Sequence, residues 1–162
     1  SYGALLHIVN HAVTKSLLFY SSGHLLHHFQ TKEIKKIEGI FRKNPFLGSV
    51  FFFAALAIAG MPPFSIFVSE FFILSAGFSA RRFVVCTILF FLLALIFAGF
   101  LRHASQMTFG SPKESPRPGK NFLMDSVLGL GMLLILVMGF YIPRPLHELI
   151  KEASHIVQGV AS

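Results

Sequence analysis

The sequence predicts an all-α, polytopic transmembrane helix bundle with about five membrane segments, one of them a discontinuous helix, and a C-terminal amphipathic helix. Three observations lead to this prediction. Hydrophobic residues make up 54% of the 162 residues, including 20 phenylalanines. Charged residues, at 13%, separate long apolar runs, a pattern typical of membrane proteins. A proline pair, Pro62 and Pro63, interrupts the apolar middle of the chain.

Apolar runs define the predicted membrane segments. A helix needs about 20 residues to cross about 30 Å of hydrocarbon, and the first, fourth and fifth runs are long enough. The middle stretch is too long for one straight crossing and short for two, so we expect two short helices there, the second discontinuous, divided at Pro62 and Pro63. The predicted spans cover about 3–26, 46–61, 64–79, 83–101 and 122–142.

The segments between and after these runs are polar. Residues 27–45 are expected to form a polar loop, and 102–121, rich in Pro, Ser and Gly, a flexible loop. The tail, 143–162, is a separate unit after a membrane domain of 1–142. Its apolar residues have helical spacing, so we expect an amphipathic helix on the membrane surface or on a partner. They are Leu146, Leu149, Ile150, Ala153, Ile156 and Val157.

The net charge of +7 does not indicate a nucleic-acid partner, because the basic residues flank apolar segments instead of forming one patch. The expected surroundings are a lipid bilayer. If the chain crosses the membrane five times, nine basic residues lie on one side and four on the other, which favours the side with nine as cytoplasmic. The nine are Lys32, Lys35, Lys36, Arg42, Lys43, Arg81, Arg82, Arg144 and Lys151, and the four are Arg102, Lys113, Arg117 and Lys120.

The first span carries a lysine that lipid would oppose. Lysine at a helix centre costs about 2.5–3.5 kcal/mol on the insertion scale. The eight large apolar residues between positions 3 and 20 return roughly 2.4–4.8 kcal/mol on that scale. Lys15 alone therefore cancels most of the gain, and His7 and His11 add further cost. We expect this helix to be buried in a bundle, with its polar face against protein or water.

The three polar residues of the first span share one stripe. Residues at i, i+4 and i+8 step by about 40° each around a helix, which aligns His7, His11 and Lys15. Two imidazoles and a desolvated amine can accept and release protons near physiological pH. Two alternatives remain: a polar stripe that only joins helices, and a metal site, for which neither Cys nor carboxylate completes the histidine set within the helix.

Glu70 is the single charged residue between Pro45 and Ala80. Backbone left unpaired by Pro62 and Pro63 survives at membrane depth where protein or water satisfies it, so the interruption is expected to line a wet cavity. If the helix restarts with Ser69 as its N-cap, Glu70 lies in the first turn, near the positive end of the dipole. Glu70 is then a second proton-binding station. The alternative is an interfacial glutamate after a simple loop.

Three motifs in order, "HIVNHAVTKSLLFYSSG", "IEGIFRKNP" and "LAIAGMPPFSIFVSEFFIL", resemble the C-terminal part of the antiporter-like membrane subunits. These occur in respiratory complex I, in multisubunit sodium/proton antiporters and in formate hydrogenlyase-type hydrogenases. The ending "GFYIPRPLHELIKEA" is most similar to the hydrogenase-associated members. The resemblance implies a C-terminal fragment of a longer polytopic protein.

The resemblance also implies roles for particular residues. His7, His11 and Lys15 match the central proton path of the family, and Glu70 matches a charged residue in a later broken helix that gates the far-side exit. Some relatives carry lysine at that position. The family's other repeat, with its own carboxylate and lysine, has no counterpart in this sequence.

The predicted function is a multi-pass subunit of the cell (inner) membrane that translocates protons for a respiratory-type oxidoreductase complex. Its expected partners are other membrane subunits, and no cofactor is expected, because the sequence has no cluster motif or haem pair. The alternatives are a sodium/proton antiporter subunit, a cytochrome whose histidines on facing spans bind haem, and an inert truncated anchor.

Overall fold

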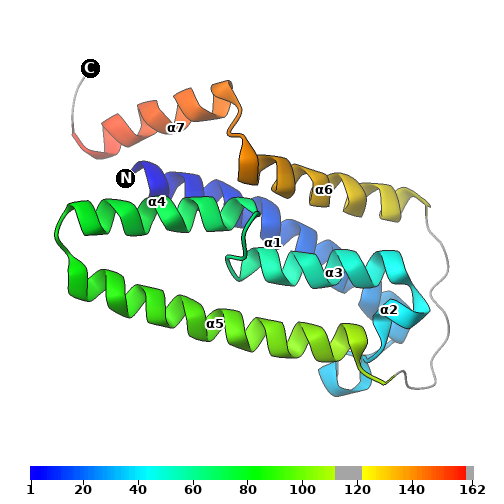
Figure 1. Cartoon of the computed structure of the whole chain (residues 1–162). Helices are drawn as coiled ribbons and strands as arrows, with labels where there is room; N and C mark the ends of the chain where they lie inside the picture. The colour runs from blue at the N-terminus through cyan, green and yellow to red at the C-terminus, as the bar shows by residue number, and fades with distance from the viewer. Residues whose placement is uncertain (112–121, 160–162) are drawn as a thin grey trace.

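The computed structural model describes residues 1–111 and 122–159, and this part of the chain is all-helical (Figure 1). The all-α class is therefore confirmed, and each predicted membrane segment and the tail contains a helix. The elements in order are α1 (Tyr2–Phe29), the 3₁₀ helix η1 (Ile34–Lys36), α2 (Ile40–Lys43), α3 (Pro45–Ile58), α4 (Ser65–Ser79), α5 (Phe83–Phe109), α6 (Phe122–Phe140) and α7 (Arg144–Val157).

The two predicted loops are less extensive than expected. Residues 27–29 belong to α1, and the rest of the 27–45 segment contains η1 and α2. The prediction of a loop is wrong for residues 102–109, which continue α5. Polar side chains mark where a helix leaves an apolar environment, but they do not end the helix, because Arg and Gln are good helix formers. The remainder of that predicted loop, 112–121, lies outside the described residues.

The helices α3 and α4 lie end to end beside α1, as Figure 1 shows. With 14 and 15 residues they are about 21 and 22 Å long, each shorter than the hydrocarbon layer. The 28 residues of α1 span about 42 Å, and α1 contacts both of them. Together, α3 and α4 are therefore about as long as α1.

The number of crossings stays a prediction, but the end-to-end order of α3 and α4 changes how the basic residues are distributed between the two ends of the bundle. The connection between α4 and α5, which contains Arg81 and Arg82, lies at the opposite end of the bundle from the loop that follows α1 (Figure 1). The C-terminal end of α5, the part of that helix that contains Arg102, lies at the same end as that loop. The described basic residues at the end with the α1–α2 loop are Lys32, Lys35, Lys36, Arg42, Lys43 and Arg102. Those at the other end are Arg81, Arg82, Arg144 and Lys151. Lys113, Arg117 and Lys120 lie outside the described residues.

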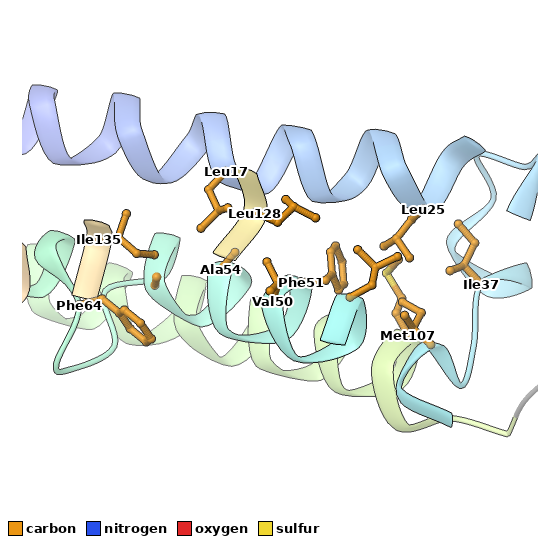
Figure 2. Packing of buried hydrophobic residues seen from close by; sticks show 13 residues of the cluster. Leu17, Leu25, Ile37, Val50, Phe51, Ala54, Phe64, Met107, Leu128 and Ile135 are labelled. Atoms are coloured by element: carbon orange, nitrogen blue, oxygen red, sulfur yellow. The ribbon is translucent and has the colours of Figure 1, made fainter. Parts of the chain in front are cut away.

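Buried apolar side chains hold α1, α3, α5 and α6 together (Figure 2). The cluster comprises Leu17, Leu25, Ile37, Ile40, Leu47, Val50, Phe51, Ala54, Ala57, Phe64, Met107, Leu128 and Ile135. Outside this core, α5 and α6 expose large apolar residues, such as Phe90 and Phe91 at 65% and 69%. Of the described helices, these two are long and apolar enough to cross a membrane unaided. An apolar surface of this extent is typical of contact with lipid or protein.

The tail helix α7 packs on the first turn of α1. The Tyr2 hydroxyl and Nδ1 of His147 are 2.8 Å apart, and the hydroxyls of Ser1 and Ser154 also form a hydrogen bond. Ile150 is buried on the same side. The helix is thus confirmed, and its described contacts are with α1.

Candidate functional site

The interruption between α3 and α4 covers residues 59–64 and contains Pro62 and Pro63. Gly60 turns the chain there with a φ of +82°, a conformation that costs other L-residues about 1–2 kcal/mol. A Cβ at Gly60 would collide with Oε2 of Glu70. The carboxylate of Glu70 therefore lies directly against the backbone of the interruption.

Glu70 lies in the second turn of α4 and not in the first. The prediction of Ser69 as N-cap is wrong, because α4 begins at Ser65 with Phe64 in the capping position and no side-chain cap. The Ser69 hydroxyl donates to the Ile66 carbonyl over 2.8 Å within the helix. The favourable effect of the helix dipole on Glu70 falls off within the first turn and is not available here.

His7 connects α1 to α4 at the level of Glu70. Its Nδ1 lies 3.0 Å from the Ser69 hydroxyl, and its ring centroid lies 5.8 Å from that of His11. His7 and Glu70 also line one cavity of about 100 Å³, whose other lining residues are apolar: Ile73, Leu89 and Leu93. The structure thus brings His7, His11 and Glu70 together, although the residues come from two helices.

Lys15 lies at the middle of α1 but on a different side from this cavity. Its side chain is exposed in the described part of the chain, and its Nζ lies 5.7 Å from the ring centroid of Phe19. Two steps of 40° separate Lys15 from His7 around the helix, and α4 covers the His7 side. The burial of Lys15 stays a prediction for the longer protein.

A second polar line runs along the buried face of α1. Asn10, Thr14, Ser21 and His24 are each at most 2% exposed, and with Leu17 they follow a spacing of four and three residues. The Nδ2 of Asn10 donates to the Ser65 carbonyl over 2.7 Å, at the point where α4 restarts. Three buried oxygens close to this restart, Asn10 Oδ1, Thr14 Oγ1 and Ser65 Oγ, have no hydrogen-bond partner among the described residues.

The far end of this line lies near a carboxylate. His24 lies close enough to Asp125, in the first turn of α6, for the carboxylate charge to act on the imidazole. Sequence reasoning missed this pair, because the two residues are far apart in the chain. The signal for the rest of the line was the heptad-like spacing of small polar residues in α1.

Within 1–111 and 122–159, no group of three His, Cys, Asp or Glu side chains is placed to hold a metal ion.

Comparison with known proteins identifies the family of the chain. The family model described as "NADH:quinone oxidoreductase/Mrp antiporter, TM" matches residues 1–97, which include α1, the interruption and Glu70. The chain belongs to this family. The resemblance inferred from the sequence is thereby confirmed, and the chain is a membrane protein.

Relatives in the family come from three kinds of complex. The chain is 29% identical over 158 residues to the hydrogenase-4 component F homolog of Methylacidiphilum infernorum, covering 98% of the chain and 33% of the relative. It is 29% identical over 141 residues to a Na⁺/H⁺ antiporter subunit of Bacillus subtilis, covering 85% and 29%. It is also 29% identical over 160 residues to an NADH-quinone oxidoreductase subunit of Pseudomonas aeruginosa, covering 96% and 30%.

The chain therefore spans about a third of the length of these curated relatives. The three identities are equal, so identity does not separate the hydrogenase, antiporter and quinone-oxidoreductase groups.

Proposed function

We propose that this chain is the C-terminal part of a multi-pass subunit that moves protons across the inner membrane for a multisubunit oxidoreductase complex. Its membrane domain would cover 1–142 and its amphipathic tail 143–162, and its partners would be other membrane subunits. The observation that carries the proposal is the shared cavity of His7 and Glu70 beside the interrupted helix. Two of the relatives support it, because they are named as a hydrogenase component and a quinone oxidoreductase subunit.

The described contacts suggest an order of proton transfer. A proton on His11 can pass to His7, whose ring centroid is 5.8 Å away, with a water between them. His7 then faces the Ser69 hydroxyl at 3.0 Å and shares its cavity with the Glu70 carboxylate, which accepts the proton. Ionisable groups inside membrane segments commonly form proton relays of this kind. No cofactor is needed for these steps.

Lys15 would drive the relay by its charge. The Lys15 Nζ lies over Phe19 in the structure, so the relay requires the side chain to turn back towards His11. The Cβ atoms of residues one turn apart on a helix, such as His11 and Lys15, are about 5–6 Å apart. Two unit charges at that distance repel by about 3 kcal/mol at an effective dielectric constant of 20. Protonation of Lys15 therefore moves the proton from His11 towards Glu70, and its deprotonation lets the histidines reload.

The exposed face of α1 supports a larger assembly. Ile8, Phe19 and Tyr20 are 64%, 65% and 59% exposed, and Lys15 lies among them. A lysine at this depth against lipid costs about 2.5–3.5 kcal/mol, a cost that protein or water would remove. We propose that the rest of the subunit or a neighbouring subunit covers this face.

Proton movement after Lys15→Ala tests the proposal. The variant is made in the full-length subunit within its complex, and acidification of inverted membrane vesicles is followed with a fluorescent pH probe. We expect acidification to be lost while the complex still assembles. Lys36→Ala is the matched control, since Lys36 lies in the loop after α1 and pairs with Glu33 over 2.7 Å. Equal acidification by wild type and Lys15→Ala would overturn the assignment.

A second candidate is a subunit of a sodium/proton antiporter complex. The chain is as similar to the Bacillus subtilis relative as to the other two, and that relative is named as part of a Na⁺/H⁺ antiporter. This equal identity supports the antiporter function as an alternative. Vesicles given an imposed pH gradient and no redox substrate separate the two functions. Dissipation of the gradient on addition of Na⁺ indicates the antiporter, and acidification that requires an electron donor indicates the oxidoreductase.

A further inference from the structure

A groove of about 360 Å³ opens on the bundle at the end opposite α7, away from His7 and Glu70. Its walls come from α1, α3, α5 and the segment after α1. Most of the lining is apolar, including Leu18, Leu25, Phe51 and Phe100. The volume lies within the 300–1,000 Å³ range of small-molecule sites.

Lys32 and His103 are the titratable residues of the groove lining, and both lie near one end of the bundle. On α1 the wall runs from Leu18 to Leu26, about 12 Å along the axis, and continues beyond the helix end to Lys32. On α5 it runs from Phe100 through His103 to Met107, across the point where the apolar run of that helix gives way to Arg102. The wall is thus apolar towards the middle of the bundle, and Lys32 and His103 lie nearer its end, beside the apolar Ile34 and Met107.

Charge at this end is unbalanced. The described side chains there include five basic ones (Lys32, Lys36, Arg42, Lys43 and Arg102) against three acidic ones (Glu33, Glu38 and Asp125). Glu33 pairs with Lys36, and Glu38 accepts a hydrogen bond from Gln106 over 3.3 Å. Lys32 is exposed at the mouth of the groove and forms no ion pair with a described residue.

We propose that this groove binds an anionic phospholipid, with one acyl chain along Leu18, Phe51 and Phe100 and the phosphate between Lys32 and His103. The apolar wall would hold the acyl chain towards the middle of the bilayer, and Lys32 at the mouth would hold the phosphate near the membrane surface. An apolar helix of another subunit fits less well, because it would leave the charge of Lys32 unbalanced. This proposal does not depend on the ion that the subunit transports.

Native mass spectrometry of the full-length protein tests the headgroup preference. The protein is taken from nanodiscs of equimolar phosphatidylglycerol and phosphatidylcholine, and the lipids that remain bound are counted. We expect one phosphatidylglycerol to be retained in preference to phosphatidylcholine. Lys32→Gln should reduce that preference by about fivefold, the equivalent of about 1 kcal/mol per basic residue at the surface.

Lys36→Gln is the matched control, because it removes an equal charge from the same segment outside the groove lining. Equal loss in both variants, or no headgroup preference in wild type, would overturn the proposal.

Photo-crosslinking identifies the occupant independently. Phe100→Cys carries a benzophenone label, since the native Cys86 is buried. Attachment to phospholipid supports the proposal, and attachment to a polypeptide in the assembled complex contradicts it.

Discussion

Gly139→Ala tests the contact that fixes α6 against the interrupted helix. A Cβ at Gly139 would overlap the carbonyl oxygen of Pro63 and lie 3.0 Å from the carbonyl carbon of Phe64. Both are backbone atoms, which cannot rotate away, so α6 or the interruption must move. Overpacking of this kind costs about 1–3 kcal/mol, and the gain from the helix propensity of alanine, at most about 1 kcal/mol, offsets part of it.

Two other glycines provide a graded control. A Cβ at Gly99, in α5, meets nothing within 4 Å, and one at Gly131, in α6, meets Leu17 Cδ1 at 3.0 Å, the movable end of a side chain. Thermal unfolding of the full-length protein in detergent should therefore rank Gly139→Ala as the least stable variant and Gly99→Ala as the most stable, with Gly131→Ala between them. Equal midpoints for Gly139→Ala and Gly99→Ala would refute the reasoning, because the backbone contact would then have no energetic effect.

Three further predictions concern the interruption and the core of the bundle. Asn10→Ala removes the hydrogen bond to the start of α4 and should cost about 1 kcal/mol, whereas Ser79→Ala, at an exposed hydroxyl, should change unfolding by less than about 0.5 kcal/mol. Leu128→Ala, at a fully buried position, should cost about 2–5 kcal/mol in the same unfolding assay. Gly60→Ala should cost about 1–2 kcal/mol through its positive φ and should also slow acidification of vesicles, because the new methyl group displaces the carboxylate of Glu70; unchanged transport would contradict that contact.

The sequence predicted the helical segments better than their ends and connections. Long apolar runs mark segments that must be shielded from water, and each of them is helical. The end of an apolar run does not mark the end of its helix, so α5 continues eight residues beyond Leu101. Whether α3 and α4 form one crossing or two depends on their relative direction, and the local sequence around Pro62 and Pro63 does not determine that direction.

The sequence predicted only part of the candidate site. Spacing places His7, His11 and Lys15 near one another on α1, but it does not say which part of an 80° arc the neighbouring helix covers. Contact with α4 falls on His7, through Ser69, and the buried face extends to Asn10 and Thr14. Ser69 is a favourable N-cap by composition, whereas α4 begins at Ser65 with Phe64 in the capping position. A cap without a side-chain hydrogen bond has no sequence signal, so the turn that holds Glu70 could not be chosen from sequence.

The central claim is that protons cross the membrane through the groups around the interrupted helix. Glu70→Gln tests it most directly, because glutamine keeps the size of the side chain beside Gly60 and cannot carry the proton. The measurement is the number of protons moved per electron by the full complex in sealed vesicles. The account predicts that this ratio falls to near zero while the complex remains assembled and electron transfer continues. A ratio equal to that of the wild type, in a correctly assembled complex, would contradict it.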